Sequence, residues 1–274
     1  TLFAAPALAQ PPVAIDRGAT DGVDRPIHDL SGEGDASSLE LNPALLSGVR
    51  GFDFVVRGYH SNDSFGRGDG VGGFFALGAL GFAAGFGVQA LRPGFDDDLH
   101  DSMRALNPDA VKLSGGIALG DPDRGALGIG VSRLRRSSEL GQGWLGGPDL
   151  DLGIVSRLTN YASMGLTARL SPASFSSVGM RNFLTLDSEL AIRPLGNRWL
   201  EFAGGVRARV ERVEDGGLGT FGGENLLGHG RLALRYQGLT LAGEVEQIPV
   251  VQLDESTLEI DATGTALRGS FNIG

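Results

Sequence analysis

The sequence contains no cysteine, which excludes disulfide bonds, thiol chemistry and cysteine-based zinc sites. It has a single lysine, Lys112, so that 22 of its 23 basic side chains are arginines. These are outnumbered by 33 acidic side chains, and the formal net charge is -10. Nucleic-acid binding requires clustered basic side chains that neutralise phosphates, so we expect no nucleic-acid partner.

Aromatic residues are also scarce, at 7%, whereas 45 of the 274 residues are glycine. A glycine inside a helix costs about 1 kcal/mol, so this composition argues against a mostly helical protein. Residues 70–91 carry no charge and are long enough to cross a membrane as a helix. Seven of these residues are glycines, however, and Phe82, Ala84 and Phe86 alternate with smaller residues. The pattern therefore predicts a β-hairpin.

The first nine residues resemble the end of a secretory signal peptide, with Ala7-Leu8-Ala9 as the cleavage site. An Ala/Pro-rich tail without structure is the alternative. Export of a protein without cysteine suits the Gram-negative envelope. We therefore divide the chain into a signal-peptide remnant at 1–9, a linker with a short plug helix at 10–48, and a β-barrel at 49–274.

The plug helix is predicted from its ends. Asp35 can cap a short helix, because its side chain can accept hydrogen bonds from free backbone amides. Asn42-Pro43 should interrupt that helix, since proline disfavours helical geometry in the residue before it.

From residue 49 onward, apolar and polar residues alternate with a period of two, as in β-strands. Within 199–211, for example, Leu200 and Phe202 lie on one face, and Glu201 and Arg207 on the other. The pattern predicts twelve strands of about ten residues. They are 49–59, 71–78, 81–92, 111–120, 125–135, 149–158, 161–170, 183–193, 199–211, two within 230–247, and 264–273.

Short and long connections alternate between these strands, and strands of this length suit a bilayer crossing. We therefore predict an all-β fold: an up-and-down antiparallel transmembrane β-barrel in the outer membrane, with lipid around it. A soluble periplasmic lipid-binding barrel would show the same alternation with its apolar face inward. The scarcity of aromatic residues counts against the membrane barrel. The long connections are expected at 60–70, 93–110, 137–148, 171–182, 213–226 and 249–263.

The polar face of the predicted strands carries nearly equal numbers of basic and acidic residues. Such a face favours Arg–carboxylate pairs that fill the barrel, and a narrow, gated conduit or an anchor rather than an open porin. The residues expected in this charge network are Arg207, Arg209, Arg231, Arg235, Glu189, Glu201, Glu244 and Glu246.

No motif predicts catalysis, a metal or a cofactor. Residues 217–222 match GxGxxG but lack the strand and helix that a dinucleotide site needs. Lys112 and Ser114 share a strand face and could form a Ser-Lys dyad, although a lumen charge is the simpler interpretation. Asp96-Asp97-Asp98 is better explained as a helix start than as a calcium site.

The segment Gly34–Leu46, which includes Asn42, Pro43, Ala44 and Leu45, resembles the NPAxL segment of FadL-like and PorV-like outer-membrane barrels. That resemblance implies that Asn42, Pro43, Ala44 and Leu45 belong to a plug, and that the barrel transports hydrophobic small molecules.

A second resemblance covers Pro11–Gly18, residues 42–44 and the hairpin that ends Leu91-Arg92-Pro93. These segments are similar to the N-terminal region of myxobacterial signal-peptide-peptidase-like (peptidase S49) proteins. The resemblance implies a non-catalytic barrel that anchors a larger envelope protein, with a periplasmic peptidase domain beyond residue 274. The catalytic serine and lysine motifs of that family are not matched in this sequence. Anchoring is our leading hypothesis, with transport and the soluble barrel as alternatives.

Overall fold

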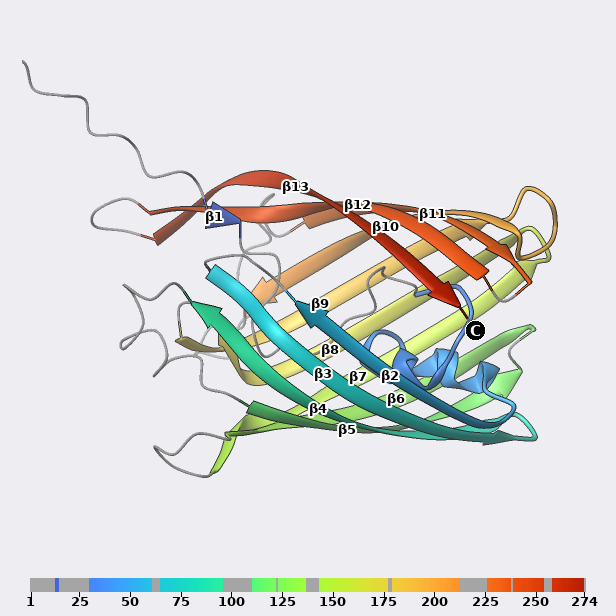
Figure 1. Ribbon diagram of the computed structural model, residues 1–274, viewed down its shortest axis with the longest axis horizontal. Coiled ribbons are helices and arrows are strands. Elements are labelled where there is room, and N and C mark those ends of the chain that lie inside the picture. The colour runs from blue at the N-terminus through green and yellow to red at the C-terminus, as the bar shows by residue number, and fades with distance from the viewer. Residues whose placement is uncertain are drawn as a thin grey trace, which may run out of the picture.

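The computed structural model describes residues 13–14, 30–60, 65–95, 110–121, 123–136, 143–176, 179–211, 226–237, 239–253 and 258–273. A single antiparallel sheet curves around two short 3-10 helices (Figure 1). The elements are β1 Val13–Ala14, η1 Ala36–Glu40, η2 Pro43–Gly48, β2 Gly51–His60, β3 Phe65–Ala79, β4 Phe82–Phe95, β5 Ala110–Asp121, β6 Gly125–Arg136, β7 Gly143–Thr159, β8 Ala162–Ser176, β9 Gly179–Ile192, β10 Leu200–Glu211, β11 Leu226–Tyr236, β12 Leu239–Leu253 and β13 Leu258–Ile273.

Each strand from β2 to β13 pairs antiparallel with its neighbours in sequence, so the sheet is an up-and-down meander. These strands match the twelve expected ones in order, which confirms the predicted fold class. The hairpin predicted at 70–91 is β3–β4, and its turn is Leu80–Gly81. Both turn residues have positive φ, 54° and 79°, as in the tight turns that suit the twist of a hairpin. The pairing path runs from β1 through β12 and back along the chain to β2, and β13 pairs with β12 beside this path. Among the described residues, no pairing joins β2 to β13.

The apolar face of the strands points outward. On β2, for example, Phe52, Phe54 and Val56 are 65%, 59% and 63% exposed. Buried polar and charged side chains alternate with such residues along the strands and point inward. A continuous apolar outer wall is what lipid requires, and it argues against the soluble barrel, whose apolar face would be hidden.

The few aromatic rings with polar groups lie near the ends of the wall. Tyr161, Trp199 and Tyr236 are exposed near the ends of strands, where short turns connect them. Trp199 and Tyr236 contact each other edge to face, with ring centroids 5.6 Å apart. Near the opposite end, Trp144 lies against the Arg133 guanidinium. These positions suit the two membrane interfaces, where amphipathic rings gather.

The regular alternation of short and long connections was wrong. We expected a long loop at 171–182, but β8 ends at Ser176 and β9 begins at Gly179. Similarly, only residues 254–257 separate β12 from β13. Strand pairing continues through parts of both segments. Pro172 and Pro249 interrupt the strand signal in the sequence, because proline cannot donate a hydrogen bond to a neighbouring strand.

The first helix, η1, begins after Asp35 and ends before Asn42-Pro43, as the sequence predicts, whereas the second helix, η2, was not predicted. Asp35 caps η1 by accepting a hydrogen bond from the Ser37 backbone amide. Asn42 caps η2 in the same way, and Pro43 occupies its first turn. No helix among the described residues has the length and apolarity needed to cross a membrane.

Candidate functional site

Residues 30–48, which we call the plug, lie inside the curved sheet and include η1 and η2 (Figure 1). Its backbone–backbone hydrogen bonds, such as Ser38 to Asp35 and Leu45 to Asn42, join residues of the plug or its immediate neighbour Val49. The sheet pairings include no residue of the plug. Within the described residues, the plug is therefore held to the wall by side chains and packing.

Six successive strands each present a glycine to the plug or to Val49, the residue that follows it, and we call these glycines the glycine seat. At Gly128, an added Cβ would lie 2.3 Å from the backbone nitrogen of Ala44. At Gly153, it would lie 2.1 Å from the Asn42 side-chain oxygen. No side chain fits in these spaces, so glycine is required for the plug backbone to approach the wall. The glycine seat consists of Gly78, Gly85, Gly116, Gly128, Gly153 and Gly165.

The four predicted plug residues lie at the centre of this contact. Asn42 is fully buried, and its amide nitrogen donates to the carbonyls of Leu30, at 2.8 Å, and Ile154, at 3.1 Å. Its side-chain oxygen accepts from the Ala44 amide. Pro43, Ala44 and Leu45 are also buried. Asn42 therefore joins Leu30, at the start of the plug, to strand β7.

The plug carboxylate of Glu40 is buried against Lys112 and Ser114. Lys112 Nζ lies 2.8 Å from Glu40 Oε2, and the Ser114 hydroxyl donates to the other carboxylate oxygen. Arg169 donates to the Glu40 backbone carbonyl at 2.6 Å. Burial alone would raise the pKa of Glu40, but the Lys112 ammonium and these donors hold that pKa below its ordinary value. The carboxylate therefore stays ionised, and the Lys112–Ser114 pair is held by Glu40.

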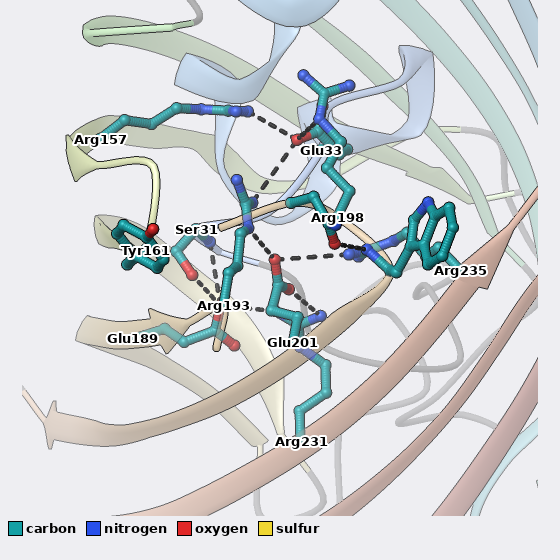
Figure 2. Close-up of polar contacts among 12 residues, drawn as sticks. Ser31, Glu33, Arg157, Tyr161, Glu189, Arg193, Arg198, Glu201, Arg231 and Arg235 are labelled. Carbon is teal, nitrogen blue, oxygen red and sulfur yellow. Dashed lines mark hydrogen bonds and ion pairs between the residues drawn. The ribbon is translucent and has the colours of Figure 1, made fainter. Parts of the chain in front are cut away.

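A second polar contact, which we call the strap, is made by residues 31–35. The Ser31 hydroxyl donates to Glu189 at 2.5 Å, and its backbone amide donates to the same oxygen at 3.1 Å. Asp35 pairs with Arg57 at 2.9 Å. Between them, Glu33 reaches the wall arginines shown in Figure 2. The strap is thus fixed by charges on widely separated strands.

The wall opposite the helices is filled by its own ion pairs. Glu201 is fully buried and contacts Arg193 at 2.7 Å, Arg231 at 2.9 Å and Arg235 at 3.5 Å (Figure 2). Arg231 also contacts Glu189 at 3.1 Å. These contacts link strands β9, β10 and β11, so the cluster occupies space and ties neighbouring strands together.

A separate cluster is centred on Arg207, which contacts Asp187 at 2.8 Å and Glu246 at 2.9 Å. The structure therefore places six of the eight expected network residues in two clusters. Glu244 is buried on β12, opposite Arg231 in the strand register. The side chain of Arg209 lies outside the described residues, as do 217–222 and Asp96-Asp97-Asp98.

Glu33, Glu40 and Arg198 are among the site residues that escaped the sequence interpretation. Glu33 and Glu40 lie outside the alternating strands, and Arg198 belongs to a turn. One signal was available. The plug segment contains Glu33, Asp35 and Glu40 but no basic residue, so its acids need partners on the wall.

No protein-family model and no curated protein matches the sequence. Among solved structures, the chain is similar to the ΔS2S3 mutant of TodX, a monoaromatic hydrocarbon channel. The two are 14% identical, with a TM-score of 0.52, over 93% of this chain and 89% of TodX. The NanC porin is 12% identical, with a TM-score of 0.46, over 81% of this chain and 98% of NanC. The resemblance to S49 peptidase proteins receives no support from these neighbours. The chain therefore has a membrane-embedded β-barrel fold, shared with TodX.

Proposed function

We propose that this protein is a gated channel for small molecules in the Gram-negative outer membrane, closed by residues 30–48. The observation that carries the proposal is the self-contained plug. Among the described residues, its backbone–backbone hydrogen bonds lie within the plug and Val49, and its contacts with the wall are ion pairs, hydrogen bonds that involve side chains, and packing. Such an element can leave its seat as a unit without breaking the pairing of any strand.

The surface beneath the plug supports small hydrophobic molecules as the transported class. Leu39 and Leu46 of the plug pack against Phe74, Ala83 and Ala118 of strands β3 to β5. Withdrawal of the plug would uncover this apolar strip, and apolar linings are typical of small-molecule sites. The similarity to a monoaromatic hydrocarbon channel points in the same direction.

Anchoring of a larger envelope protein stays a prediction. The inward ion pairs are compatible with an anchor, but they do not explain a plug with its own seat.

A disulfide lock tests the gate. A Cβ added at Gly130 would lie 3.7 Å from Pro43 Cβ and no closer than 3.5 Å to any other neighbour. This separation is within the roughly 3.5–4.5 Å that a disulfide requires, and no native cysteine competes. In the Pro43→Cys/Gly130→Cys variant we expect a closed channel when oxidised and wild-type conductance after reduction, measured in planar bilayers. The two single-cysteine variants serve as controls.

Equal conductance of the oxidised and reduced double-cysteine variant would contradict gating by the plug. The substrate class has its own measurement, which is uptake of labelled toluene by cells that express the protein. We expect oxidation of the lock to slow this uptake. A lock that controls conductance but leaves toluene uptake unchanged would contradict the hydrophobic substrate and leave the gate standing.

A further inference from the structure

Three arginines of the wall converge on one plug carboxylate oxygen. Glu33 Oε1 lies 2.9 Å from Arg157 Nη2, 3.0 Å from Arg198 Nε and 3.6 Å from Arg193 Nη2 (Figure 2). Arg157 comes from the end of β7, and Arg193 and Arg198 come from the β9–β10 connection. Both places lie at the end of the barrel where the short turns are, which we call the short-turn end.

This cluster has more buried donors than the described residues satisfy. The side chains of Arg157 and Arg193 are only 12% and 5% exposed. Arg157 Nε and Arg193 Nη2 are buried, and neither has a hydrogen-bond acceptor among the described residues. Buried polar groups are nearly always paired, so two such donors beside one carboxylate indicate unused capacity to bind an anion with more acceptor oxygens.

The surrounding charges also favour an anion. The ion pairs of this region join five arginines to three glutamates, namely Arg157, Arg193, Arg198, Arg231 and Arg235 to Glu33, Glu189 and Glu201 (Figure 2). One of the three glutamates, Glu33, belongs to the plug and can leave with it. Arg157 and Arg193, which are largely buried, would then lose this carboxylate, and a buried charge with less compensation is costly.

We propose that Arg157, Arg193 and Arg198 form a binding site for a small oxyanion, a carboxylate or a phosphate, and that Glu33 is its built-in occupant. The guanidinium fork matches the oxygens of both groups. Arg198 is 55% exposed, so the site is accessible from the short-turn end. A bound anion displaces Glu33 and loosens the strap, which leaves Ser31 and Asp35 as its remaining ties.

Glu33 competes with free anions for this site, and the measurement must account for that competition. A carboxylate tethered by a short segment has an effective concentration on the order of millimolar, so free anions must exceed that level to displace it. The Glu33→Gln variant removes the competing charge but keeps the shape of the side chain. We expect it to bind acetate or phosphate at least ten-fold more tightly than the wild-type protein. Binding is measured by titration calorimetry on the full chain in detergent at constant ionic strength, with chloride as reference.

The matched control is the Glu33→Gln/Arg157→Gln variant, in which binding should be lost. Acetate alone would identify a carboxylate site, and phosphate alone a phosphate site. Chloride binding as strongly as either, or a double variant that binds as well as Glu33→Gln, would overturn the proposal.

A second measurement does not depend on the folding of the Glu33 variants. Ser31 is fully buried, so the thiol of a Ser31→Cys variant should react with maleimide only when the strap moves. We expect acetate or phosphate to raise its labelling rate several-fold. The same treatment should not change the Ser47→Cys variant, because Ser47 is buried in η2, which does not belong to the strap. An unchanged rate at both positions would contradict displacement of the strap.

The consequence for transport rests on the proposed channel, but anion binding does not. Anion binding with a disulfide lock that leaves conductance unchanged would refute the channel and keep the site. A lock that controls conductance in a protein that binds no anion would refute the site and support the channel.

Discussion

The two halves of the barrel wall differ in the residues that they present to the interior. On β3 to β8, each strand presents a glycine to the plug or to Val49, so the backbones approach closely. On β9 to β12, the inward side chains are long and charged, as in Glu189, Glu201 and Arg231, and they pair with one another. η1 and η2 pack mainly against β2 to β7. Where the plug fills the lumen, the wall makes room for it with glycines. Elsewhere the side chains of the wall fill the lumen.

This difference separates two kinds of stability. Ion pairs in the charged half join strand to strand, so their loss should weaken the wall. Packing in the glycine half joins wall to plug, so its loss should free the plug and leave the wall intact. Substitutions in the two halves should therefore have different readouts, which gives three ways to break or sharpen the comparison.

The largest effect is expected in the charged half, from Glu201→Gln. This change leaves Arg193, Arg231 and Arg235 around a neutral amide, and breaking a buried ion pair from one side costs about 3–5 kcal/mol. The midpoint of urea unfolding in lipid vesicles should fall accordingly. Asp123→Asn is the control, because its pair with Arg50 is exposed and should contribute less than about 1 kcal/mol. Similar losses in both variants would contradict a wall held by buried pairs.

A smaller effect is expected in the glycine half, from Gly128→Val. Its side chain would overlap the plug backbone, and overpacking of this kind costs about 1–3 kcal/mol. Because about 1.4 kcal/mol corresponds to ten-fold, maleimide labelling of Ser47→Cys should rise roughly ten-fold, with little change in wall unfolding. In the control Gly115→Val, the added Cβ has no neighbour closer than 4.0 Å, so labelling should stay at the starting rate. A loss of wall stability without plug release would contradict the proposed difference between the two halves.

The smallest effect is a dependence on pH through Glu40. Its pKa is lowered in the folded protein from an ordinary value of 4.5, so the folded state binds this proton less readily than the unfolded state. Its contribution to stability is complete above about pH 4.5 and is lost as the pH falls through the folded pKa. The difference in melting temperature between wild type and Glu40→Gln should be constant above that pH and shrink below it. A difference that grows on acidification would contradict the Glu40–Lys112 pair.

The strands and the first plug helix could be predicted because their signals are local. Alternation along 199–211 marks a half-buried strand, and Asp35 marks a helix start by its capping chemistry. Asn42-Pro43 was interpreted only as an interruption, whereas Asn42 caps the second helix. The outward direction of the apolar face could not be read in this way. Alternation has the same period whether the apolar side meets lipid or a core, so only the three-dimensional arrangement decides between them.

The sequence also could not predict which charged residues pair with one another. Glu33 meets Arg157 and Arg198 across more than a hundred residues of chain, and nothing local selects these arginines. The glycine seat shows the same limit. Gly128 and Gly115 look alike in the sequence, but one touches the plug and the other faces open space. Composition predicts that glycines matter, whereas the fold determines which ones do.

The long-range contacts of the plug have a consequence for assembly. Ser31 meets Glu189 and Asn42 meets Ile154, so residues near the start of the chain find their partners 158 and 112 positions later. Contacts between such distant residues form late, because the intervening chain must first be ordered. The plug also contributes no strand to the wall, so the sheet does not need it as a template. The plug is therefore among the last segments to reach its native position, after the wall that surrounds it has formed.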